Sequence, residues 1–326
     1  MRCWRRVALY ATLYAALLAL MCGGVAAQPF PNRPVKLVVS FAAGSGSDII
    51  ARILADDLRH AFNQPILVEN KPGASAQIAA EYVAKAPPDG YTLFVTSNTA
   101  HSANPFLFKT LRYDPVRDFT PITRVLSLPY VLVVSPTSPL KSVADLVARA
   151  GANPGKLNYG YGNSTSQVAG ASFIRQGRID AAAVAYKSMP PAMTDLMGGR
   201  LDFLFVDLTS AQGFLKSGHL RPIGFSLETR SAQQADLPAI AETPGFAGYE
   251  LTSWVGIVGP AGMPRDIVLR INADLRRTLA KPEVREKLIA MGSEVASSTP
   301  EEMDQFIRQQ LDSWRGKIRD AGIQPE

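Results

Sequence analysis

A turn rich in glycine and serine near the start of the chain has residues that suit anion binding. It reads Gly44-Ser45-Gly46-Ser47-Asp48, after an apolar, β-branched stretch and before apolar residues at helical spacing. Glycine lets the backbone approach a ligand closely, and the first amides of a helix favour an anion. The turn contains no lysine or arginine, so amides and hydroxyls would hold the anion. The same residues would equally suit an ordinary strand-to-helix connection with a serine or aspartate cap.

Two more polar, uncharged loops follow predicted strands, and an aspartate ends another. In open α/β sheets, ligands bind beyond the carboxyl ends of the strands, so converging loops would form a neutral pocket rich in hydrogen-bond donors. Asp207 would suit a ligand amino group or ring N–H, and it would equally suit the N-cap of the segment after it. The predicted ligand-binding residues are Gly44, Ser45, Gly46, Ser47, Asp48, Thr96, Ser97, Asn98, Thr99, His101, Asn163, Ser164, Thr165, Ser166 and Asp207.

Motifs of catalysis and cofactor binding are missing from the sequence. There is no G-x-S-x-G elbow, Walker A loop or H-E-x-x-H pair. The two G-x-G turns fail the dinucleotide pattern at Ile49 and Thr165. The three histidines lie far apart, and for His101 a structural or hydrogen-bonding role is favoured over catalysis. We therefore expect no catalytic residue, metal site or cofactor, and a protein that is not an enzyme.

The first 27 residues have the pattern of an export leader. A basic start precedes an uncharged apolar run, and Val25-Ala26-Ala27 offers small residues for cleavage. Both cysteines, Cys3 and Cys22, lie in this segment, so the mature chain would contain no disulfide, zinc-thiolate site or cysteine nucleophile. The net charge is +6, but the basic residues form no cluster of the kind that indicates nucleic-acid binding. We expect a monomer that is secreted to the periplasm.

Strands and helices alternate along the rest of the chain, as in an α/β fold. Strands are predicted over residues 35–40, 66–69, 91–96, 130–134, 157–159, 181–184, 201–206, 220–225 and 250–258, and helices over 48–59, 76–85, 191–197, 265–279 and 282–291. Ser298 and Glu301 have the spacing of a capping box for a last helix. The length favours two domains, here residues 28–128 with 252–326, and residues 129–251.

Over essentially the whole mature chain, the sequence resembles the Bug family, the periplasmic solute-binding receptors of tripartite tricarboxylate transporters. The matching stretches include Arg33-Pro34-Val35-Lys36-Leu37, Gly44-Ser45-Gly46-Ser47-Asp48, Val68-Glu69-Asn70-Lys71-Pro72-Gly73, Pro88-Asp89-Gly90-Tyr91-Thr92, Pro154-Gly155-Lys156-Leu157 and Ser298-Thr299-Pro300-Glu301. The resemblance implies a type II periplasmic binding protein fold, in which two α/β domains joined by two crossovers close around a cleft.

The resemblance also implies the function. A receptor of this kind captures a small carboxylate through loop amides, hydroxyls and water, and delivers it to membrane transporter subunits. The alternatives are a sensor module that presents its ligand to a membrane signalling protein, and a cleft enzyme acting on a small acid. The sequence departs from the family pattern near the expected cleft, with Ala42-Ala43 where prolines are usual and Ser188 where glycine is usual.

Overall fold

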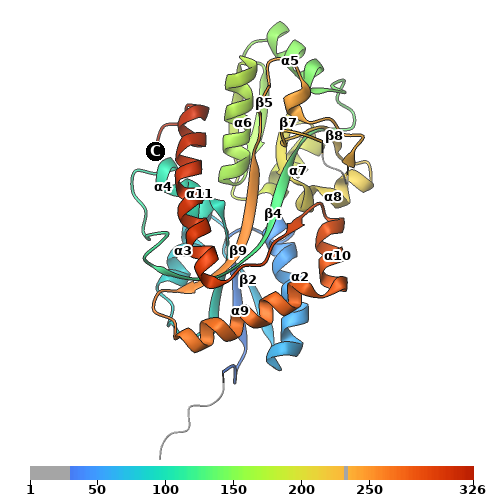
Figure 1. Cartoon of the computed structure of the whole chain (residues 1–326). Helices are drawn as coiled ribbons and strands as arrows, with labels where there is room; N and C mark the ends of the chain where they lie inside the picture. The colour runs from blue at the N-terminus through green and yellow to red at the C-terminus, as the bar shows by residue number, and fades with distance from the viewer. Residues whose placement is uncertain (1–29, 231–233) are drawn as a thin grey trace, which may run out of the picture. The chain divides into compact units, whose positions relative to one another are not determined.

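The predicted alternation of strands and helices is present in the computed structural model, which describes residues 30–230 and 234–326 (Figure 1). The predicted leader, residues 1–27, and both cysteines lie outside the described residues. Residues Arg33–Glu326 group together by their contacts. Within the described residues, no helix is both long enough and apolar enough to span a membrane.

The described strands are β1 (Val35–Val39), β2 (Ile66–Asn70), β3 (Thr92–Ser97), β4 (Phe119–Val134), β5 (Leu157–Tyr161), β6 (Ala181–Ala185), β7 (Phe203–Asp207), β8 (Arg221–Phe225), β9 (Thr252–Pro260) and β10 (Glu294–Val295). The helices are α2 (Gly46–Phe62), α3 (Gln77–Ala84), α4 (Asn104–Leu107), α5 (Val143–Ala152), α6 (Ser164–Gly177), α7 (Met189–Met197), α8 (Leu208–Lys216), α9 (Arg265–Ala280), α10 (Pro282–Ala290) and α11 (Pro300–Ala321). One turn of π-helix, η2 (Thr99–Ala103), follows β3.

Two sets of parallel strands meet through two long antiparallel strands. Strands β2, β1 and β3 are parallel neighbours, and β3 pairs with β9. On the other side β6, β5 and β7 are parallel neighbours, and β7 pairs with β4. The strand order is therefore β2-β1-β3-β9-β4-β7-β5-β6. The carboxyl ends of β1, β3 and β5 are each followed by a short turn and then a helix, and β7 continues directly into α8.

The two central strands run side by side through the fold (Figure 1). The first part of β4 pairs with β9, and its last part pairs with β7 and β8. The segments 127–130 and 251–254, which contain the predicted domain boundaries, include a direct pairing of Ser127 with Trp254 and of Pro129 with Thr252. Any hinge motion between the two sets of strands would therefore have to bend β4 and β9.

Apolar side chains cover both sets of strands. Val38, Phe94 and Met303 belong to one buried cluster, which packs around the first set. Phe173 and Phe203 belong to another, around the second set. The long helix α11 contributes to both clusters, because Trp314 and Ile318 near its end pack with the second set while Met303 packs with the first.

The predicted start of α11 is wrong by one residue. Thr299, rather than Ser298, is the N-cap: its Oγ1 accepts a hydrogen bond from the Glu302 amide at 3.2 Å, and the Glu302 carboxylate accepts one from the Thr299 amide at 2.8 Å. This frame puts Pro300 at the first helical position, where its missing N–H costs no hydrogen bond. Glu301 pairs with Arg265 instead.

Candidate functional site

The loops at the carboxyl ends of the strands enclose a small buried cavity in the middle of the sheet. Its lining is neutral apart from one carboxylate, and consists of Phe41, Ser45, Gly46, Ser47, Ser97, Thr99, Leu128, Tyr130, Asn163, Ser188, Met189, Asp207 and Ser253. None of these described lining residues is a lysine, arginine or histidine. The volume is about 20 Å³, enough for about one water molecule. A larger ligand would need its walls to move apart.

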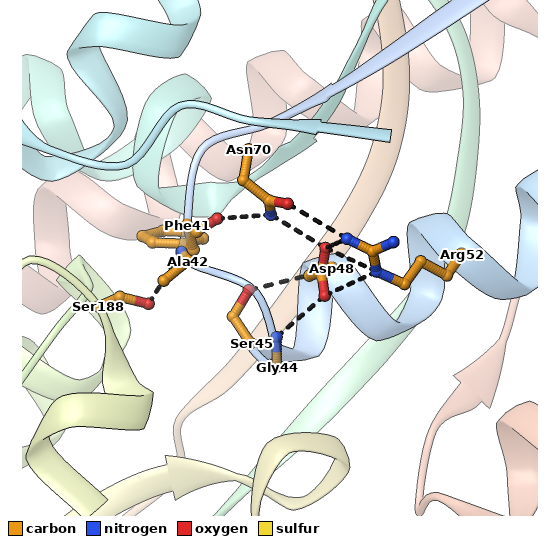
Figure 2. Close-up of polar contacts among 8 residues, drawn as sticks. All are labelled: Phe41, Ala42, Gly44, Ser45, Asp48, Arg52, Asn70 and Ser188. Atoms are coloured by element: carbon orange, nitrogen blue, oxygen red, sulfur yellow. Dashed lines mark hydrogen bonds and ion pairs between the residues drawn. The ribbon is translucent and has the colours of Figure 1, made fainter. Parts of the chain in front are cut away.

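A hydrogen-bond network centred on Asp48 fixes the shape of the first loop (Figure 2). The Asp48 carboxylate accepts hydrogen bonds from the Gly44 amide at 2.9 Å, the Asn70 side-chain amide at 2.9 Å and Arg52 at 3.0 Å. Asn70 also donates to the Phe41 carbonyl at 2.9 Å. Burial favours the neutral acid, but these donors outweigh it, and the pKa of the Asp48 carboxyl lies below its usual range. Asp48 thus stabilises the loop without lining the cavity.

The N-terminus of α2 points its first residues at the cavity. Ser45 is the N-cap and accepts from the Asp48 amide at 3.4 Å. Gly46 and Ser47, the first two helical residues, both belong to the lining. Amides at the start of a helix have no intrahelical acceptor and carry the positive end of the helix dipole. This wall of the cavity is suited to a carboxylate.

The second loop contributes Ser97 and Thr99 to the lining, while its neighbours form the support. Asn98 donates to Thr165 Oγ1 at 2.7 Å and accepts from Ser253 Oγ, so it links this loop to the third loop and to β9. Thr96 Oγ1 lies 2.7 Å from His101 Nδ1, and both residues are fully buried.

His101 lies among aromatic rings away from the cavity lining. Its ring centroid is 4.7 Å from that of Phe119 and 6.3 Å from that of Trp254. Burial lowers the pKa of the imidazole to about 3. His101 is therefore neutral at physiological pH, in keeping with the structural or hydrogen-bonding role favoured over catalysis.

The third loop is a helix cap that presents one side chain to the cavity. Asn163 Oδ1 accepts from the Ser166 amide at 2.8 Å, and Ser166 Oγ accepts from the Asn163 amide at 3.2 Å. Tyr130 donates to the same Asn163 oxygen at 3.1 Å from β4. Ser164 donates to Asn104 Oδ1 at 3.3 Å. The polar groups of this loop thus serve largely to start α6 and to fasten it to its surroundings.

Asp207 both caps a helix and lines the cavity, so the two interpretations of it from the sequence are compatible. Its carboxylate accepts from the Ser210 amide at 2.8 Å and from Ser210 Oγ at 2.7 Å, which starts α8. The carboxylate lies directly against the first residue of α2: a Cβ added to Gly46 would be 2.3 Å from Asp207 Oδ1. Only glycine leaves room for this approach.

The cavity brings together seven of the residues predicted from the sequence, drawn from all three loops and from the end of β7. These are Ser45, Gly46, Ser47, Ser97, Thr99, Asn163 and Asp207. The other eight are not part of the lining, and are Gly44, Asp48, Thr96, Asn98, His101, Ser164, Thr165 and Ser166.

Six lining residues were not predicted as site residues. They are Phe41, Leu128, Tyr130, Ser188, Met189 and Ser253. Leu128 and Tyr130 belong to β4 and Ser253 to β9, so the two crossing strands form part of the cavity wall. Ser188 could have been predicted, because the sequence has serine there in place of the glycine that is usual in the family.

The strand order, the central cavity and the neutral, donor-rich lining define a mixed α/β periplasmic binding protein fold. The family model described as the tripartite tricarboxylate transporter family receptor matches residues 50–323. The chain therefore belongs to this family of solute-binding receptors, as the sequence resemblance predicted. The prediction of a receptor rather than an enzyme is confirmed by this membership.

Individual relatives cover nearly all of the chain. A UPF0065 protein encoded in the tcbD-tcbE intergenic region of Pseudomonas sp. strain P51 is 33% identical, over 89% of this chain and 86% of its own length. Among solved structures, R. palustris Rpa4515 with adipate has a TM-score of 0.88 at 33% identity, over 91% of this chain and all (100%) of that one. MatC from Rhodopseudomonas palustris with bound malate has a TM-score of 0.82 at 29% identity, over 89% of this chain and 100% of that one.

Proposed function

We propose that this protein captures a small carboxylate in the cavity between its strand ends and delivers it to the membrane subunits of a tripartite tricarboxylate-type transporter. One observation carries the proposal: the N-terminus of α2 and the hydroxyls of Ser47, Ser97 and Thr99 line the same buried cavity. Such a wall supplies donors for a carboxylate without a cationic side chain. Relatives solved with adipate and with malate support a carboxylate as the ligand.

The proposal extends to the organisation and location of the receptor. Residues 28–128 with 252–326 form one domain and residues 129–251 the other, and the protein works as a periplasmic monomer after removal of residues 1–27. Membership of a family of transporter receptors supports this location and a membrane partner. The fifteen residues predicted from the sequence remain the proposed site: the seven that line the cavity contact the ligand, and the other eight, among them Asp48, His101 and Ser164, hold the lining in place.

A thermal-shift screen of small carboxylates tests the function. A ligand that binds only the folded state stabilises it, by about 2.7 kcal/mol at a concentration one hundred times its Kd. We expect at least one mono- or dicarboxylate to raise the melting temperature, and the uncharged amide of the same acid to leave it unchanged. If no small carboxylate raises it, or if the amide raises it equally, the proposed function is wrong.

Salt dependence tests how the carboxylate is held. Because the described lining contains no lysine, arginine or histidine, binding to amides and hydroxyls should depend only weakly on ionic strength. Calorimetric titration of the best carboxylate at low and at high sodium chloride should give similar affinities. A steep loss of affinity with salt would mean that a cationic side chain holds the ligand.

A further inference from the structure

A second cavity lies on the reverse face of the two crossing strands, and we call it the hinge cavity. Its volume is about 380 Å³, within the range of sites that hold small organic molecules. Ser127 and Pro129 of β4 and Thr252 of β9 line it. Their neighbours Leu128 and Ser253 line the ligand cavity at the strand ends instead. Because successive side chains of a strand point to opposite faces, the two cavities lie back to back across β4 and β9.

The walls of the hinge cavity come from both sides of the hinge. Leu227 belongs to residues 129–251, proposed above as one domain, while Ile289 on α10 belongs to the other. If the two domains swing apart at the ligand cavity, β4 and β9 are the pivot, and the walls on the reverse face approach each other. Opening of the ligand cavity therefore narrows the hinge cavity.

The hinge cavity combines apolar walls with one unpaired positive charge. The charge belongs to Arg285, an exposed residue of α10 that makes no ion pair with another described residue. No acidic residue stands three or four positions from it along the helix, where a partner would lie. Its guanidinium is therefore free to bind an anion. The apolar lining residues are Pro129, Leu227, Ile289 and Val295.

The lining also contains one carboxylate, that of Glu294. Burial lowers the pKa of the Arg124 guanidinium, and the negative charge of Glu294 opposes this change. The charge of Glu294 thus has a counter-charge in Arg124, whereas that of Arg285 has none among the described residues. An anion in the hinge cavity would supply it.

We propose that the hinge cavity binds an amphipathic organic anion, with one carboxylate on an apolar body, and that this second ligand favours the closed form of the receptor. Arg285 pairs with the carboxylate, and the apolar body packs between Leu227 and Ile289. An occupant keeps these two walls apart and so opposes opening. Each ligand then raises the affinity for the other, as linkage requires. This coupling rests on the proposed function, whereas binding of the anion does not.

Titration calorimetry with octanoate and with the uncharged 1-octanol tests the site. We expect Arg285→Gln to weaken octanoate binding at least about tenfold, as for the loss of a charge-assisted hydrogen bond, and to leave 1-octanol unaffected. Lys287→Gln is the matched control, because it removes a positive charge from the same exposed helix but lies outside the lining. It should bind octanoate normally. Absence of octanoate binding, or equal binding by wild type and Arg285→Gln, would overturn the proposal.

Two measurements test the coupling. Saturating octanoate should raise the affinity for adipate, the acid bound by one solved relative, at least about fivefold in the wild type and not in Arg285→Gln. Octanoate alone should lower the radius of gyration of the wild type, measured by small-angle scattering. A weaker affinity for adipate would show that octanoate competes for the ligand cavity, and an unchanged affinity and radius would show no coupling; either result overturns the proposal.

The two proposals can fail separately. If neither adipate nor any other small carboxylate binds the ligand cavity, the proposed function is wrong. The dependence of octanoate binding on Arg285, and the radius of gyration with octanoate alone, still decide whether the hinge cavity binds an anion and favours the closed form.

Discussion

The amide nitrogen of Ala42 donates a hydrogen bond to Ser188 Oγ at 3.2 Å, across a separation of 146 residues in the sequence (Figure 2). Ala42 lies in the turn after β1, and Ser188 is the residue before α7. Proline at position 42 would lack this donor, and glycine at position 188 would lack the acceptor. Both departures from the family pattern therefore contribute to one direct contact between the two sets of strands.

A disulfide at this contact should lock the cavity shut. The natural sequence has cysteine only at positions 3 and 22, so Ala42→Cys with Ser188→Cys gives an unambiguous pair once the leader is removed. We expect the oxidised double variant to bind no carboxylate and the reduced form to regain binding, because a cavity of about 20 Å³ must open to admit a ligand. Each single cysteine variant serves as the control. Normal binding by the fully oxidised protein would show that access does not need these walls to part.

Ligand binding should make the protein more compact in solution, because we expect the ligand-free protein to open further than this nearly closed structure, whose cavity is only about 20 Å³. We expect the two sets of strands to hinge at segments 127–130 and 251–254, which pair through Ser127 and Trp254. Small-angle scattering should give a smaller radius of gyration at saturating ligand than without ligand. The oxidised cysteine pair provides the control, since its radius should be small and indifferent to ligand. An unchanged radius for the wild type would argue against closure about a hinge.

Alanine at Thr99 and at Ser164 should have different effects, although the sequence predicted both as ligand-binding residues. Thr99 lines the cavity, so Thr99→Ala should weaken carboxylate binding by about 1 kcal/mol or more and change the melting temperature little. Ser164 instead donates to Asn104 Oδ1, so Ser164→Ala should lower the melting temperature and leave affinity nearly unchanged. Calorimetry and thermal denaturation of both variants would measure the two effects. Normal binding by Thr99→Ala would remove the second loop from the site.

The strand-turn-helix unit around Gly44 was predictable because its signals are local. The apolar pattern changes from β-branched to helical spacing across two glycines, and the structure has β1 and α2 on either side. The start of α11 was harder, since Ser298 with Glu301 and Thr299 with Glu302 both fit a capping box. Pro300 distinguishes the two capping boxes, because only an N-cap at Thr299 puts the proline at the first helical position.

The division between lining and supporting residues could not be predicted from the sequence. Asp48 and Ser47 are neighbours in one polar turn, yet Ser47 lines the cavity and Asp48 bonds to Asn70 on the adjacent strand. Which side chain faces inward depends on contacts between residues far apart in the chain. The same applies to Ser188, whose place in the lining depends on α7 lying opposite the turn after β1.

Histidine 101 should make the stability of the protein sensitive to acid. Burial lowers its pKa to about 3 in the folded state, whereas a histidine in the unfolded chain has a pKa of about 6.5. Between these values the unfolded state binds a proton that the folded state does not. Stability therefore falls as the pH drops through this range, by about 1.4 kcal/mol per pH unit.

Urea denaturation of wild type and His101→Gln at pH 7.5 and pH 5 would isolate this contribution. Lowering the pH should cost the wild type about 2 kcal/mol more than the variant, since glutamine does not titrate. The comparison uses the change between the two pH values, so any loss of stability from breaking the contact between Thr96 and His101 cancels. His60→Gln, on an exposed side chain, controls for the loss of a histidine as such. Equal pH sensitivity in wild type and His101→Gln would mean that His101 is protonated as readily in the folded protein as in the unfolded chain.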